Sequence, residues 1–130
     1  MKKILKFKRD TKGQSLVEFA LVLPILMVLI LGMIEFGWIL NGKITLTSAA
    51  REGARVAVIY ESAAQASTAV QSAVTRSAES SSLTGVTTVT TFDEPTKSAV
   101  INVNAKIKPI IGLFFSGDVT LSSKAEMRIE

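Results

Sequence analysis

The chain has 130 residues, room for one small domain and one membrane segment. It contains no cysteine and no histidine, which excludes disulfides, the usual zinc sites, and Ser-His-Asp or Cys-His catalysis. The net charge of +4 is uneven, because the first 13 residues hold six of the 15 basic residues and one of the 11 acidic residues. We therefore expect no enzyme activity, no catalytic residue, no metal and no cofactor.

The basic segment at residues 1–13 stands directly before a long apolar run. Basic residues beside a membrane segment favour a cytoplasmic location for that end of the chain. This placement explains the basic charge without nucleic acid, so we expect no nucleic-acid partner.

Residues 19–40 form an apolar run whose only charge is Glu35. As a helix the run spans about 33 Å, enough for the hydrocarbon core of a bilayer. It is too long for a signal-peptide core, and the polar residues after it offer no small-residue cleavage site. Pro24 and Gly32 are tolerated in membrane helices, Pro24 is expected to kink the helix, and Trp38 suits the interface. The sequence predicts a single pass, with the amino terminus inside and the carboxyl terminus outside.

Two carboxylates, Glu18 and Glu35, lie 17 residues apart near the two ends of this segment. The separation is about 26 Å along a helix, which places them near opposite faces of one bilayer. Glu35 is expected to be an interfacial carboxylate that reaches water beside Trp38. The same interpretation is open for Glu18. Alternatively, a chain that began at Gln14 would supply an amino group to neutralise Glu18 in an apolar assembly.

After residue 42 the pattern becomes that of an amphipathic helix. Apolar and small residues recur at steps of three and four, which is one helical stripe: Leu46, Ala50, Gly53, Ala57, Tyr60 and Ala64. Ala49, Gly53 and Ala57 form a ridge of small residues that permits close helix packing. The ridge could pack on the chain's own head or between subunits, and the sequence does not separate the two.

Residues 13–20, Pro24, residues 35–37 and residues 49–55 together resemble TadE-like proteins, pseudopilins of the tight-adherence (Tad or Flp) type IV pilus system. The resemblance implies cleavage by a prepilin peptidase between Gly13 and Gln14. It also implies that Glu18 sets the register of subunit assembly. Gln14 stands where many pilins have an aromatic residue or methionine. The implied partners are the peptidase, other pilin or pseudopilin subunits and the assembly platform, in pilus biogenesis and surface adherence.

The remaining residues predict a small α+β head outside the membrane. Residues 62–82 are rich in alanine and serine and favour a second helix, with a mobile linker as the alternative. Three segments favour β-strands by composition or alternation, at residues 86–92, 101–107 and 119–129. The apolar link at residues 110–115 covers the core or forms an exposed patch for a partner.

The predicted fold is therefore a pilin-like α+β arrangement, with a long helix laid across a three-stranded antiparallel sheet. Its expected divisions are a leader at 1–13, a helix at 14–60 (membrane part 16–40, amphipathic part 43–60) and a head at 61–130. The leading functional hypothesis is a pseudopilin in the cytoplasmic membrane that is recruited into an extracellular pilus or into its assembly platform. The alternative is a permanently anchored single-pass binding or adhesin module that keeps its leader.

Overall fold

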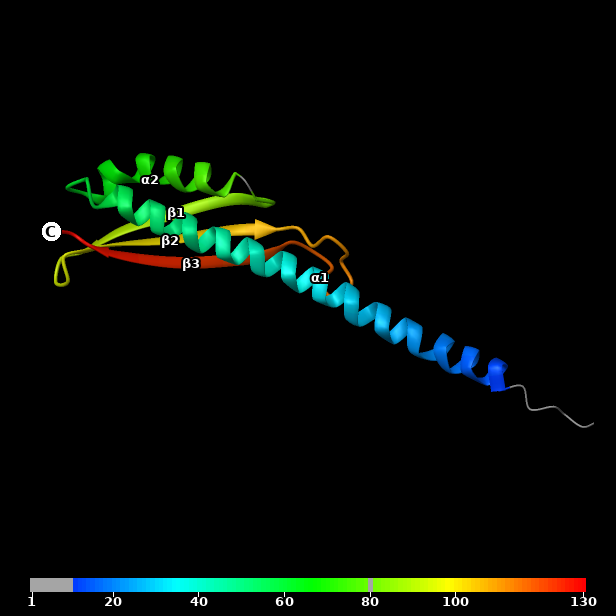
Figure 1. The fold of residues 1–130 in the computed structure, drawn as a ribbon. Helices are drawn as coiled ribbons and strands as arrows, with labels where there is room; N and C mark the ends of the chain where they lie inside the picture. Colours follow the sequence, from blue (N-terminus) through cyan, green and yellow to red (C-terminus); the bar gives the residue numbers. More distant parts are fainter. Residues whose placement is uncertain (1–10, 80) are drawn as a thin grey trace, which may run out of the picture.

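The computed structural model describes residues 11–79 and 81–130, so most of the expected leader, residues 1–10, lies outside the described residues. The described chain forms helix α1 (Thr11–Ala57), helix α2 (Ala63–Ala78) and strands β1 (Leu83–Asp93), β2 (Ser98–Ile107) and β3 (Val119–Arg128). Figure 1 shows one long helix that leaves the small head at one end. The predicted α+β class, with its second helix and three-stranded antiparallel sheet, is confirmed.

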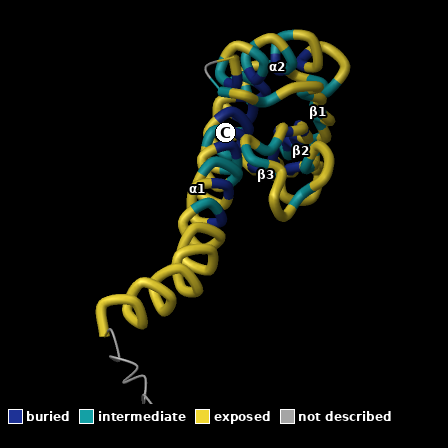
Figure 2. The backbone as a smooth tube through the Cα atoms, turned by 90° about the vertical axis from the view of Figure 1, so that its right-hand side faces the viewer, coloured by how far each residue is buried: buried dark blue, intermediate teal, exposed yellow. Residues whose placement is uncertain are grey.

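Helix α1 runs without interruption through Pro24 and Gly32. Its amino-terminal part, where every residue from 11 to 30 is exposed, bends away from the line of the remainder (Figure 2). Pro24 lies in this part. It lacks the N–H that an inner helical residue donates, which is the physical reason for expecting a kink here. The helix ends at Ala57 rather than at the expected residue 60. The N–H groups of Ile59 and Tyr60 bond three residues back, to the carbonyls of Val56 and Ala57, which closes α1 with a tight turn.

Helix α2 confirms the helical interpretation of the alanine- and serine-rich segment, although it ends at Ala78 and not near residue 82. Ser62 caps its start, because the Ser62 side chain accepts a hydrogen bond from the N–H of Gln65. Ala66, Val70, Val74 and Ala78 recur every four residues and form its buried face.

The three strands form an antiparallel meander in the order β1-β2-β3. Both helices cover the same face of this sheet, with α1 along β2 and β3 and α2 along β1 (Figure 2). Alternate residues of β2 point into the core, as the sequence pattern predicts: Ala99, Ile101, Val103, Ala105 and Ile107. The core is therefore a single layer between the helices and one face of the sheet.

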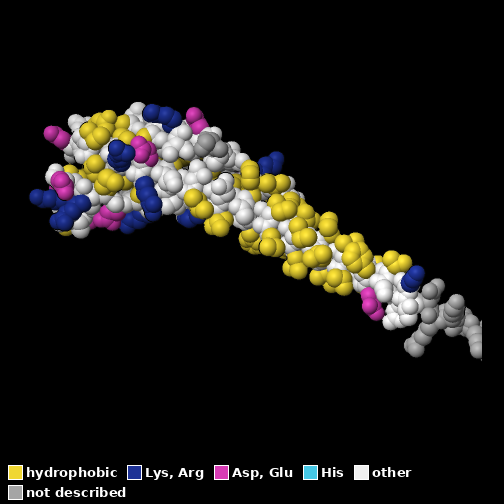
Figure 3. Space-filling model, viewed as in Figure 1, with side chains coloured by type: hydrophobic (Ala, Val, Ile, Leu, Met, Phe, Trp, Pro, Cys, Tyr) yellow, Lys and Arg dark blue, Asp and Glu magenta, His cyan; other side chains and the backbone are white. Residues whose placement is uncertain are grey.

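The head covers only the carboxyl-terminal part of α1. Buried residues of α1 begin at Gly32 and continue along one face to Ala57. The part before Gly32 projects from the head and carries exposed hydrophobic side chains, many of which lie on the face shown in Figure 3. The expected membrane part, residues 16–40, consequently overlaps the head over its last nine residues.

Candidate processing and assembly site

The expected cleavage site lies at the free end of α1. Gly13 and Gln14 belong to the first turn of the helix, and both are exposed. The N–H groups of a first turn have no partner inside the helix, and glycine favours helix by about 1 kcal/mol less than alanine. A β-carbon added at Gly13 would meet no atom within 4 Å. The bond after Gly13 is thus sterically open and lies where local unwinding is easy.

Glu18 lies one turn further along and is also exposed. Its Oε1 accepts a hydrogen bond from Nε2 of Gln14, 3.3 Å away. This bond joins residues four apart on one helical face. The three residues that the sequence analysis assigned to processing and assembly therefore share one exposed segment, distant from the head.

Glu35 has a different environment from the one expected. Its side chain is fully buried, with no water-exposed surface. Oε1 accepts the N–H of Gly112 at 2.7 Å, and Oε2 accepts the N–H of Phe114 at 3.3 Å. The prediction of an interfacial carboxylate that reaches water was wrong, because the link between β2 and β3 folds back over α1 and supplies these donors. We call this arrangement of Glu35, Gly112 and Phe114 the Glu35 clamp.

The β2–β3 loop, residues 108–118, packs along α1 and not over the core. Trp38 Nε1 donates a hydrogen bond to the carbonyl of Lys108 at 3.2 Å. The ring of Phe36 lies 6.0 Å from that of Phe114 and 6.1 Å from that of Phe115, between centroids. A β-carbon added at Gly32 would lie 2.9 Å from the Phe114 ring, so this glycine permits the contact.

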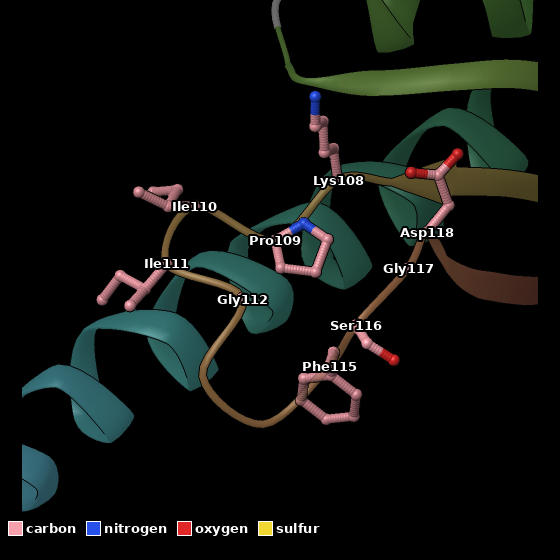
Figure 4. Close-up of a pocket in the computed structure, with 9 residues that line it drawn as sticks. All are labelled: Lys108, Pro109, Ile110, Ile111, Gly112, Phe115, Ser116, Gly117 and Asp118. Carbon is pink, nitrogen blue, oxygen red and sulfur yellow. The ribbon is translucent and has the colours of Figure 1, made fainter.

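Figure 4 shows the loop crossing α1 with Gly112 beside the helix. Residues 108–112 and 115–118 line an open pocket of about 340 Å³ on the loop itself. Gly112 has a φ of +68°, a left-handed conformation that glycine adopts without strain, and this turn presents its N–H to Glu35.

The ridge of small residues on α1 packs against the chain's own head. Ala49, Gly53 and Ala57 are all buried. A β-carbon at Gly53 would lie 2.7 Å from Cγ2 of Val74 in α2 and 3.4 Å from Cγ2 of Ile101 in β2. Of the two accounts that the sequence left open, the structure places this face within the subunit.

Sequence reasoning did not single out Gly42, where an added β-carbon would lie 2.6 Å from Cδ1 of Ile107. Gly32, Gly42 and Gly53 are spaced by ten and eleven residues. Three helical turns take about 10.8 residues, so this spacing puts all three on one face of α1. This spacing of glycines is the feature of the sequence that could have predicted close packing of the head along α1.

Within residues 11–79 and 81–130 no group of three or more His, Cys, Asp or Glu side chains could hold a metal ion. In the Glu35 clamp, the carboxylate instead accepts two backbone N–H groups.

Residues 13–55 match the family model described as TadE-like protein. The match confirms the resemblance on the stretch that carries Glu18, Glu35 and the first two residues of the small-residue ridge, Ala49 and Gly53. A search of curated proteins and a search of solved structures each found no significant match. The match stops two residues before α1 ends, so α2 and the sheet lie outside it.

Proposed function

The chain carries a TadE-like segment at residues 13–55, and from this premise we propose that it is a pseudopilin, a structural and assembly subunit of a Tad-type type IV pilus. A prepilin peptidase cuts between Gly13 and Gln14. The mature subunit keeps α1 in the cytoplasmic membrane, with the head outside. It then joins other pilin or pseudopilin subunits and the assembly platform, in a pilus that serves surface adherence.

The observation that carries this proposal is the projecting, apolar end of α1. Several large hydrophobic side chains of this end are more than half exposed, including Leu16, Phe19 and Leu21. Fully burying such a side chain stabilises by about 1.5–3 kcal/mol, so this surface requires a non-aqueous environment. Its length and composition fit one membrane span. In a fibre, neighbouring helices replace the lipid around the same surface.

Cleavage would supply the partner that Glu18 requires in such surroundings. A new amino group at Gln14 is a cation at neutral pH, and an unpaired charge at mid-membrane costs about 2.5–3.5 kcal/mol on insertion scales. Pairing of Glu18 with the amino group of an adjacent subunit removes that cost for both charges. Because the pair forms at one axial position, it also fixes the register of the subunits.

The experiment that tests this proposal is the intact mass of the protein extracted from membranes of its native host. A mass lower by residues 1–13 is expected. The full-length mass would refute cleavage after Gly13, and would support a permanently anchored module with an uncleaved leader. A mass lower by a different number of residues would move the cleavage site, so that Glu18 would no longer be the fifth residue of a mature chain that begins at Gln14.

A further inference from the structure

We propose that residues 109–116 of the β2–β3 loop form a second membrane-contact element, seated in the lipid leaflet on the head's side of the bilayer. The proposal goes beyond the pilus role, and it rests only on α1 spanning the membrane. Its occupant is lipid: the apolar loop side chains lie in the leaflet beside α1, and the Glu35 clamp holds the loop there.

The chemistry of the loop fits a lipid contact. Residues 109–116 contain no charge, whereas Lys108 and Asp118 flank them. Ile110, Leu113 and Phe114 expose 56, 46 and 51% of their surface. Exposed apolar patches of this kind mark interaction sites, including membrane sites.

The depth of the loop also fits. Tryptophan prefers the membrane–water interface, and Trp38 holds the start of the loop through the carbonyl of Lys108. The aromatic ring of Phe114 lies against Gly32, six residues earlier on α1. Six residues of helix correspond to about 9 Å. The loop therefore reaches about as far below the interface as the 5–10 Å typical of interfacial apolar segments.

The Glu35 clamp provides hydrogen-bond partners both for the backbone of the loop and for the carboxylate of α1. Irregular backbone near lipid leaves N–H groups without water, and Glu35 accepts two of them, from Gly112 and Phe114. A carboxylate inside an apolar run is costly when lipid surrounds it, and the loop removes Glu35 from lipid completely. The two polar features are therefore satisfied together.

Continuity with the membrane segment favours lipid over a protein partner. The exposed loop side chains adjoin exposed apolar residues of α1, among them Met33 and Phe36. Val28, Leu29, Gly32, Met33 and Phe36 line a shallow apolar groove with Phe114. The hydrophobic side chains continue from the projecting helix to the base of the head in Figure 3. One uninterrupted apolar surface thus includes both the span and the loop.

The absence of cysteine permits a direct test on the full chain in phosphatidylcholine vesicles. A nitroxide on Leu113→Cys is compared with nitroxides on Leu26→Cys, in the span, and Ile59→Cys, 77% exposed on the head. Collision with oxygen, which concentrates in lipid, is compared with collision with a water-soluble nickel chelate. We expect the labels at 113 and 26 to favour oxygen and the label at 59 to favour nickel.

Three outcomes would overturn the proposal. Nickel accessibility at 113 equal to that at 59 would place the loop in water. Protection of 113 from both reagents would mean that protein, such as a neighbouring subunit, covers it. Nickel accessibility at 26 would show that α1 does not span the bilayer, which removes the premise.

The clamp is tested in the same labelled chain. Glu35→Ala should raise nickel accessibility at 113 severalfold, because the loop loses both hydrogen bonds to its anchor, whereas Glu35→Gln keeps one acceptor oxygen and should raise it less. The label at 59 should be unaffected in both variants, which controls for loss of the head fold. If nickel accessibility relative to oxygen accessibility at 113 were unchanged in Glu35→Ala, anchoring by Glu35 would be refuted.

Discussion

At the scale of single residues, substitutions at Gly13 and Gly37 can be compared to distinguish an effect on peptidase recognition from an effect on the fold. Both lie on α1, and an added β-carbon meets no atom within 4 Å at either position. Alanine also favours helix over glycine by about 1 kcal/mol, so neither substitution strains the fold. Any defect specific to Gly13 therefore reports recognition by another protein.

We expect Gly13→Ala to leave the folded head and membrane insertion intact and to slow or abolish removal of residues 1–13. The accumulation of uncleaved chain is followed by intact mass and by mobility on denaturing gels, in the native host. Gly37→Ala is the matched control and should be processed normally. Normal processing of Gly13→Ala would contradict the assigned cleavage site.

Glu35 illustrates a residue whose role the sequence could not reveal. The pattern placed it at the far end of an apolar run, where water is the default partner for a carboxylate. Its actual donors lie 77 and 79 residues further along the chain, on a loop that returns to α1 only because β2 and β3 pair. Such a contact depends on tertiary structure and leaves no local spacing to detect.

Removing the Glu35 carboxylate should destabilise the head measurably. Hydrogen bonds to charged groups contribute about 1.5–3 kcal/mol each to stability, and Glu35→Ala removes two. We expect the free energy of unfolding in detergent to fall by at least about 1.5 kcal/mol. Trp38, the single tryptophan, reports the loop through its bond to Lys108, so its fluorescence can follow denaturant unfolding. A midpoint equal to that of the parent would show that the two bonds contribute no net stability.

At the scale of elements, the contact between α1 and α2 depends on the absence of a side chain at Gly53. The nearest atoms to an added β-carbon are the methyl groups of Val74 and Val70, at 2.7 and 3.3 Å. Both valines are fully buried, so an added side chain would have to displace atoms of the core. The small-residue ridge therefore sets the distance between the two helices.

Gly53→Leu should force these helices apart and lower the free energy of unfolding by about 1–3 kcal/mol, the usual cost of overpacking a core. Thermal unfolding followed by circular dichroism in detergent measures the change. Glu52→Leu adds similar apolar bulk at the neighbouring exposed position of α1 and should be nearly neutral. If Gly53→Leu is as stable as Glu52→Leu, the close contact is not required.

The elements themselves were largely predictable, because their patterns are local. The alternation in β2 and β3 and the apolar run in α1 each extend over many residues. The predictions of strands and of a helix at these places were therefore correct. The ends were less accurate. Tyr60 continues the helical stripe of the sequence, yet its N–H bonds to Ala57 and lies outside α1. A single turn decides such an end, and periodicity averaged over a long segment does not detect one turn.

At the scale of the whole molecule, α1 has two parts with different surroundings. Residues 11–31 project from the head, whereas one face of residues 32–57 packs on it. The apolar run extends into the second part, to residue 40, so the base of the head lies close to the bilayer if the run spans it. When the head lies close to the bilayer, the projecting part of α1, which contains Glu18, is the surface through which neighbouring subunits can contact one another.

The division of α1 leads to a prediction about assembly. Glu18 contacts only its own helix neighbour Gln14 among the hydrogen bonds of the described residues, so Glu18→Ala should leave the head fold, insertion and cleavage intact. In a fibre, the substitution leaves the amino group of the adjacent subunit unpaired in apolar surroundings, at a cost of about 2.5 kcal/mol or more. Incorporation should consequently fall by more than about tenfold.

The measurement is the amount of the variant in sheared, purified pili relative to the amount in membranes. Glu52→Ala removes an exposed carboxylate from the head-covered part of the same helix, so it serves as the control and should assemble like the parent. Equal losses for both variants would indicate a general effect of charge. Parent-like incorporation of Glu18→Ala would exclude the register role, because no other carboxylate lies within the projecting residues 11–31 to replace it.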